Sequence, residues 1–150
     1  MIAEKDTMAH EVVKNLSVNN NYHMKRIPMS RINDNVLVKG YQFTRNMFGK
    51  HANIWMTSTF GHLNGQTFPS AVDEHVSEEI LYAKIIDVSC NKKVSFAGEL
   101  SKKLGKNCDA VILLLDNDEE GEAITFEVID YLKDYINMPP SGNFMDAFYR

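Results

Sequence analysis

The sequence predicts an α/β fold, and three observations point to it. The run Asp109–Leu115 (DAVILLL) is continuously apolar after its first residue, which is typical of a strand buried on both faces of a parallel sheet. The segments Asp6–Leu16 and Ala123–Ile136 both place apolar residues at helical spacing. Strands that alternate with helices along a chain favour a mainly parallel sheet with helices packed against it.

The N-terminal helix is predicted over Asp6–Leu16. Its apolar residues recur at i, i+4, i+5 and i+8 from Met8, which places them on one stripe. Asp6 or Thr7 can cap the first turn with a side-chain oxygen. Asparagines at 19–21 end the helix and open a predicted polar loop. That loop contains Lys25, Arg26, Pro28 and Arg31.

Further strands are predicted in the middle of the chain. Val36–Phe43 and Asn53–Thr59 are rich in β-branched and aromatic residues, which favours two strands joined by a turn. A third strand is predicted over Ile80–Val88. The apolar spacing over 94–104 predicts a helix, which Gly105 closes. Trp55 is expected to lie in the core rather than to stack on bases, and the cations near Lys25 are expected to be solvated.

The chain is expected to form a single domain over residues 1–150. Its 150 residues are 44% hydrophobic, enough for one buried core, and a last strand is predicted over Asn143–Tyr149. The net charge of -4, from 16 basic and 20 acidic residues, argues against a nucleic-acid binder that acts through overall positive charge. It does not exclude a local basic face. The apolar run Ala110–Leu115 is far below the roughly 18 residues that span a membrane, so no membrane partner is expected.

An acidic cluster follows the predicted buried strand. Residues 116–122 read DNDEEGE, and ligands of open α/β sheets bind at the carboxyl ends of strands. If the backbone stays extended, Asp116 and Asp118 point to the same side and can reach one divalent ion. Because hard oxygen ligands suit Mg²⁺, the cluster indicates phosphoryl chemistry. The alternative is an acidic helix cap, which explains the glutamates at 119, 120 and 122 better than the two aspartates.

Four segments in the same order resemble one known family. Residues 116–122 resemble the DxDxEGE signature of the Toprim domain, and Ala3-Glu4-Lys5 is similar to the other half of that signature. Residues 57–63 (TSTFGHL) and 146–150 (DAFYR) resemble segments of type IA DNA topoisomerases, most closely of the topoisomerase III type. The resemblance implies a Toprim fold, which is a Rossmann-like, four-stranded, mainly parallel sheet flanked by helices.

The resemblance also implies an activity. Type IA enzymes cut one DNA strand with Mg²⁺, pass a strand through the break and reseal it, which relaxes supercoils. By resemblance, Glu4 would protonate the leaving 3′ oxygen and help to bind metal, while Lys5 would stabilise charge on the scissile phosphate. Asp116 and Asp118 would hold Mg²⁺, with Glu120 in a supporting role.

The DNA-binding candidates are Lys5 and His62. His62 is expected to contact DNA or the acidic cluster, and a buried, hydrogen-bonded structural histidine is an equal alternative. The implied partners are single-stranded DNA and, from the family, a RecQ-type helicase and an OB-fold accessory protein. The implied location is the nucleus in a eukaryote, and otherwise the cytoplasm with the nucleoid.

Two departures from the family pattern bear on activity. Glu119 stands where the family usually has arginine, which exchanges a phosphate-pairing cation for an anion. No tyrosine of the chain lies in an active-site tyrosine motif, so the chain is expected to be part of a larger topoisomerase and unable to perform transesterification alone. Two alternatives stay open. One is another Toprim enzyme, such as a nuclease or primase-like protein, and the other is a non-catalytic remnant.

Overall fold

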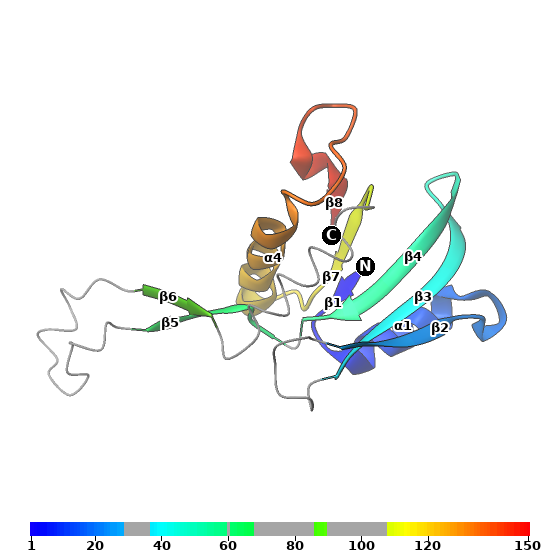
Figure 1. Ribbon diagram of the computed structural model, residues 1–150, viewed down its shortest axis with the longest axis horizontal. Coiled ribbons are helices and arrows are strands. Elements are labelled where there is room, and N and C mark those ends of the chain that lie inside the picture. Colours follow the sequence, from blue (N-terminus) through cyan, green and yellow to red (C-terminus); the bar gives the residue numbers. More distant parts are fainter. Residues whose placement is uncertain (29–36, 60, 68–85, 90–107) are drawn as a thin grey trace, which may run out of the picture.

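The computed structural model describes residues 1–28, 37–59, 61–67, 86–89 and 108–150. Its centre is a six-stranded sheet of order β2-β3-β4-β1-β7-β8, and a separate two-stranded sheet joins β5 and β6 (Figure 1). The strands of the six-stranded sheet are β1 (Ile2–Ala3), β2 (His23–Pro28), β3 (Leu37–Met47), β4 (Lys50–Ser58), β7 (Val111–Leu114) and β8 (Phe148–Tyr149). The remaining elements are β5 (Asn64–Thr67), β6 (Ile86–Ser89), α1 (Asp6–Leu16), α4 (Glu119–Leu132) and the 3₁₀ turns Val18–Asn20 and Phe144–Ala147.

The parallel part of the sheet contains four strands, β4, β1, β7 and β8. Ile2 of β1 pairs with Thr57 on one side and with Leu113 on the other, both in parallel, and Val111 pairs with Phe148. The antiparallel strands β2 and β3 extend this unit beyond β4. The predicted mainly parallel α/β sheet is therefore confirmed, with two more strands than predicted. Its geometry brings the carboxyl ends of β4, β1 and β7 to one edge.

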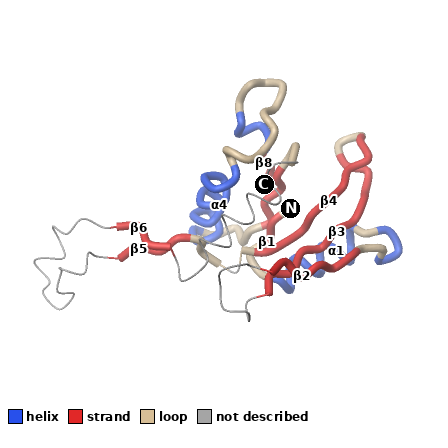
Figure 2. Tube along the Cα trace, in the orientation of Figure 1, coloured by secondary structure: helices blue, strands red, loops and turns tan. Residues whose placement is uncertain are grey.

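Two helices cover opposite faces of the sheet (Figure 2). Ile2 and Leu113 pack with residues of α4 such as Ile124. Ala3 and Met56 pack on the other face with residues of α1. Successive side chains of a strand point to opposite faces, so the two residues of β1 serve both clusters. Because β1 is buried on both faces and paired on both edges, the residues that follow it are held firmly in place.

Several element boundaries differ from the sequence prediction. β2 lies in the segment predicted as a polar loop, and its pairing with β3 ends at Pro28. An edge strand tolerates proline because one side of its backbone needs no ladder partner. Residues 144–147 form a 3₁₀ turn, so the predicted last strand is reduced to β8.

The helix predicted over Ala123–Ile136 begins and ends four residues earlier in the structure. α4 spans Glu119–Leu132 because Asp118 caps it before the predicted start at Ala123. β6 overlaps the predicted strand Ile80–Val88, while the predicted helix over 94–104 lies outside the described residues. Within the described ranges, no helix combines the length and hydropathy needed to cross a bilayer.

Candidate functional site

The two halves of the predicted acidic site meet at the carboxyl edge of the parallel strands. Glu4 and Lys5 directly follow β1, and Asp116 lies two residues after β7. The Lys5 Nζ atom is 3.1 Å from Asp116 Oδ2 and 3.5 Å from Glu4 Oε1. Parallel pairing of β1 with β7 brings these residues together across more than a hundred positions of sequence. The ammonium of Lys5 therefore lies between the two carboxylates.

The Glu4 carboxylate is buried and only partly satisfied. The residue is 7% exposed, and its Oε2 atom has no hydrogen-bond partner among the residues that the structure describes. A buried carboxylate oxygen without a partner is energetically costly. The Oε2 atom is therefore an acceptor available to a cation or a proton-bearing ligand.

Lys5 is exposed and electrostatically tied to both acids. Its hydrogen bond to Asp116 raises the pKa of Lys5, and the charges of Asp116 and Glu4 act in the same direction. The ammonium consequently stays charged across the neutral range. An exposed cation at this edge can approach an anionic phosphate without desolvation of a buried group.

Asp118 has a structural role that the sequence analysis assigned mainly to its neighbours. Its Oδ1 atom accepts a hydrogen bond of 2.7 Å from the backbone N–H of Gly121, so Asp118 is the N-cap of α4. Glu119, Glu120 and Glu122 occupy the first turn of α4, where negative charge is favourable. The helix-cap alternative therefore applies to Asp118 as well, and its second carboxylate oxygen is not engaged by the cap.

The start of α4 is packed against the backbone of Asp116. A Cβ atom built on Gly121 would lie 2.0 Å from the carbonyl oxygen of Asp116. Atoms at this separation overlap, and the obstacle is backbone, which cannot rotate away. Gly121 thus allows the helix start and the Asp116 loop to occupy adjoining space.

His62 lies beside the acidic cluster and is also held by a structural hydrogen bond. Its Nδ1 atom is 2.9 Å from Glu127 Oε1, while Glu127 Oε2 accepts a 2.6 Å bond from Leu63 N–H. Because a carboxylate only accepts, this contact assigns the proton to Nδ1. The Nε2 atom then faces Glu120, whose Oε1 is 4.0 Å away. His62 therefore lies beside the acidic cluster and is hydrogen-bonded to Glu127, while its contact with DNA stays a prediction.

Sequence reasoning missed two residues of this site. Glu127 lies seven positions after Glu120, which is two helical turns and so the same face of α4; that spacing was the available signal. Arg150 forms an ion pair with Glu122, and its Nη2 atom is 3.5 Å from the Asp116 carbonyl oxygen. A cation thus lies beside the motif although Glu119 replaces the family arginine. Only the parallel pairing of β8 with β7 brings Arg150 there.

The donor chemistry of the site suits Mg²⁺, although the ligands are not gathered around one point. Glu4, Asp116 and Asp118 supply the hard oxygens that Mg²⁺ takes, and Glu4 Oε2 accepts no hydrogen bond from the described part of the chain. Among the described residues, no three or more histidine, cysteine or acidic side chains are close enough together to hold a metal ion. Lys5 occupies the space between two of the three carboxylates.

Comparison with known proteins gives a consistent result. The Toprim domain family matches residues 1–144. The chain is 30% identical over 131 residues to DNA topoisomerase 3 of Schizosaccharomyces pombe, which covers 85% of this chain and 20% of that protein. It is 29% identical over 146 residues to DNA topoisomerase 3-beta-1 of Mus musculus, with coverage of 95% and 16%. It is 28% identical over 134 residues to human DNA topoisomerase 3-alpha, with coverage of 88% and 13%.

The chain spans about a fifth or less of the length of these relatives. The family match covers nearly the whole chain and agrees with the parallel α/β sheet. The chain therefore belongs to the Toprim domain family, and its similarity is to Toprim domains of the topoisomerase III type.

Proposed function

We propose that the chain works as the Toprim part of a type IA DNA topoisomerase, which cleaves and reseals single-stranded DNA with Mg²⁺ and so relaxes supercoils. The observation that carries the proposal is the Glu4–Lys5–Asp116 arrangement at the carboxyl edge of the sheet. In this arrangement the ammonium can bind a phosphate group, and the two carboxylates, one of them buried, can bind the metal ion that accompanies the phosphate.

Each residue has a role in this proposal. Lys5 stabilises negative charge on the scissile phosphate, and Glu4 donates a proton to the leaving 3′ oxygen. Asp116 and the carboxylate oxygen of Asp118 that takes no part in the cap would hold Mg²⁺, with Glu120 in support. When bound, Mg²⁺ offsets the charge of the phosphate and of the acids. His62, oriented by Glu127, contacts the DNA backbone through its Nε2 atom when both ring nitrogens carry a proton, because only then can that atom donate to a phosphate oxygen.

The proposal requires a nucleophilic tyrosine from outside this domain. Because the relatives are at least five times longer than the matched region, we place that tyrosine in another part of a longer protein. The RecQ-type helicase, the OB-fold accessory protein and a nuclear or nucleoid location belong to this same proposal.

Thermal melting at increasing Mg²⁺ concentration tests the metal part of the proposal. With a dissociation constant near 1 mM, 10 mM Mg²⁺ stabilises the fold by about 1.4 kcal/mol and raises the melting midpoint by about 3–6 °C. The double variant Asp116→Asn and Asp118→Asn is expected to lose this rise. Asparagine caps helices about as well as aspartate, so the double variant keeps the cap of α4.

A matched control removes two carboxylates at and just beyond the C-terminal end of α4. Asp130→Asn with Asp134→Asn changes the net charge equally and is expected to keep the full Mg²⁺ response. Equal responses in all three proteins would contradict a site at Asp116 and Asp118. Nicking of single-stranded DNA by the isolated chain, with Mg²⁺ and no added tyrosine domain, would favour a Toprim nuclease instead.

A further inference from the structure

The antiparallel part of the sheet has a charge opposite to that of the whole chain. The three strands β2, β3 and β4 contain no aspartate or glutamate, although the chain has 20 acidic residues and a net charge of -4. Their lysines and arginines are Lys25, Arg26, Lys39, Arg45 and Lys50. Lys39 pairs with Asp6 of α1, and Arg45 donates to the carbonyl oxygen of Leu16 at the end of α1. These two cations therefore lie on the α1 side, whereas the pairing register and strand alternation place Lys25 on the opposite face.

Trp55 lies on the face of these strands that points away from α1. Its neighbours Ile54 and Met56 are buried in the cluster that includes α1, and alternation along the strand places Trp55 on the opposite face. Trp55 is half-buried and is not one of the buried residues of either core cluster. The expectation that Trp55 belongs to the core is therefore not met.

The surroundings of Trp55 combine one cation with neutral polar groups. The Lys25 Nζ atom lies 5.6 Å from the centroid of the indole ring, within the range of a cation–π contact. Gln42 is the direct cross-strand partner of Trp55, and His23 is the partner of Gln42. Strand alternation adds Thr44 and Asn53 to the same face.

We infer that this face binds single-stranded DNA, with a base stacked on Trp55 and Lys25 on a neighbouring phosphate. The inference rests on the proposed function for the choice of DNA as the nucleic acid. Aromatic side chains on a sheet that also carries cations are a recurrent platform for unpaired bases, because every base has a flat π-face. Lys25 is exposed and long, so its ammonium can leave the ring for a phosphate while a base takes its place.

The position of this face fits a strand that leads to the acidic site. Trp55 lies three residues before the end of β4, which is about 10 Å at roughly 3.3 Å per residue. The carboxyl end of β4 lies at the same edge as the residues after β1 and β7. A strand of DNA on Trp55 is thus adjacent to the edge that carries Glu4 and Asp116.

The intrinsic fluorescence of the chain tests the inference directly, because Trp55 is the single tryptophan. Titration of the 150-residue chain with oligo(dT) is expected to quench the emission. The apparent dissociation constant should rise steeply with salt, as for any phosphate contact. Duplex DNA of the same length is expected to quench little, because its bases already stack on one another.

Two variants separate stacking from charge, with affinity measured by anisotropy of a labelled oligonucleotide. Trp55→Leu is expected to weaken binding about tenfold, and Lys25→Glu by a similar or larger factor with a smaller salt slope. Lys14→Glu is the matched control: it makes the same charge change on α1 and should bind like the original chain. Circular dichroism shows whether each variant is folded, and Lys25→Glu tests the face even if Trp55→Leu is unfolded.

The outcomes also distinguish this inference from the proposed function. Quenching that persists in the Asp116→Asn, Asp118→Asn variant supports the stacking face independently of the metal site. Unchanged emission while anisotropy reports DNA binding would overturn the stacking face but leave the proposed function standing. An absence of any DNA binding would also overturn the stacking face, and this result is expected if the face packs against another protein. Equal affinity of Lys25→Glu and Lys14→Glu would overturn it as well.

Discussion

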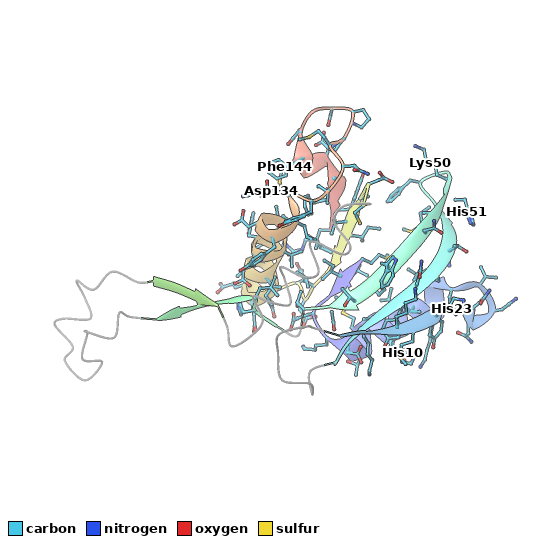
Figure 3. The ribbon with its side chains drawn as sticks, in the orientation of Figure 1. His10, His23, Lys50, His51, Asp134 and Phe144 are labelled. Carbon is cyan, nitrogen blue, oxygen red and sulfur yellow. The ribbon has the colours of Figure 1, made fainter. Side chains whose placement is uncertain are left out.

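The two ends of the sheet differ sharply in charge. β2, β3 and β4 carry five lysines and arginines and no acid, whereas residues 108–134 carry one lysine, Lys133, and nine acids. Those acids are Asp109, Asp116, Asp118, Glu119, Glu120, Glu122, Glu127, Asp130 and Asp134. Figure 3 shows Lys50 and His51 at the β3–β4 hairpin and Asp134 beyond α4, in separate parts of the molecule. The net charge of -4 is an average over two unlike surfaces, so it says little about either.

The two regions also differ in how closely their backbones approach one another. In the acidic region, Gly121 lies against the Asp116 carbonyl. In the basic region, Gly49 has φ +74 at the hairpin turn and open space around it. Glycine is thus needed at position 121 because two backbone segments pack closely there, and at position 49 because the turn has a positive φ angle.

The substitution Gly121→Ala is expected to have the largest effect. In an ordinary helix alanine is more favourable than glycine by about 1 kcal/mol, but here its Cβ would overlap backbone atoms of Asp116. We expect a loss of about 3 kcal/mol or more in the free energy of unfolding, measured by urea denaturation. Gly49→Ala is the control and should lose about 1–2 kcal/mol through left-handed strain alone. Equal losses at the two glycines would remove the distinction between the regions.

The substitution Tyr41→Phe, in β3, is expected to reduce the loss of unfolding free energy at alkaline pH. Burial, assisted by the charge and hydrogen bond of Asp6, raises the pKa of Tyr41 to about 12. A group whose pKa is higher in the folded state stabilises the fold below its unfolded pKa, near 10. That stability is lost as the pH rises from about 10 to 12, by at most about 1.4 kcal/mol per pH unit. Urea denaturation between pH 8 and 12 should show this fall in the original chain and a shallower one in Tyr41→Phe. Parallel curves would contradict the assignment.

The substitution Asp118→Ala is expected to have the smallest of the three effects. It removes the side-chain cap from the Gly121 N–H and should cost about 1 kcal/mol of unfolding free energy without Mg²⁺. Asp118→Asn should stay within a few tenths of the original, because the amide oxygen can also cap. If both variants lose the same amount, the carboxylate charge matters more than the cap.

Much of the fold could be predicted from local pattern. α1 has the predicted bounds, because its apolar stripe and the residues that flank it in sequence predict the same helix. The buried strand around Val111–Leu114 is also as predicted. β2 was missed because its polar residues and Pro28 are typical of a loop, and only pairing with β3 makes the segment a strand. The start of α4 was misplaced because its acidic first turn has no apolar periodicity.

Only those residues of the candidate site that lie within its motifs could be predicted from the sequence. The resemblance identified Glu4, Lys5 and Asp116 as one group, and the parallel pairing of β1 with β7 brings them together. The roles of these residues in catalysis remain predictions. The contacts of Arg150 with Glu122 and of His62 with Glu127 depend on how separate elements pack together. A short sequence motif does not predict contacts of this kind.

The placement of β1 has a consequence for how the chain acquires its fold. Among the described strands, β1 comes first in the sequence but lies in the interior of the parallel unit, and its partners are residues 57–58 and 113–114. Such distant pairings give a high contact order and slow folding. Ile2 and Ala3 gain their second strand partner only when residues 113–114 come into place, so β1 is expected to complete its pairing late in folding.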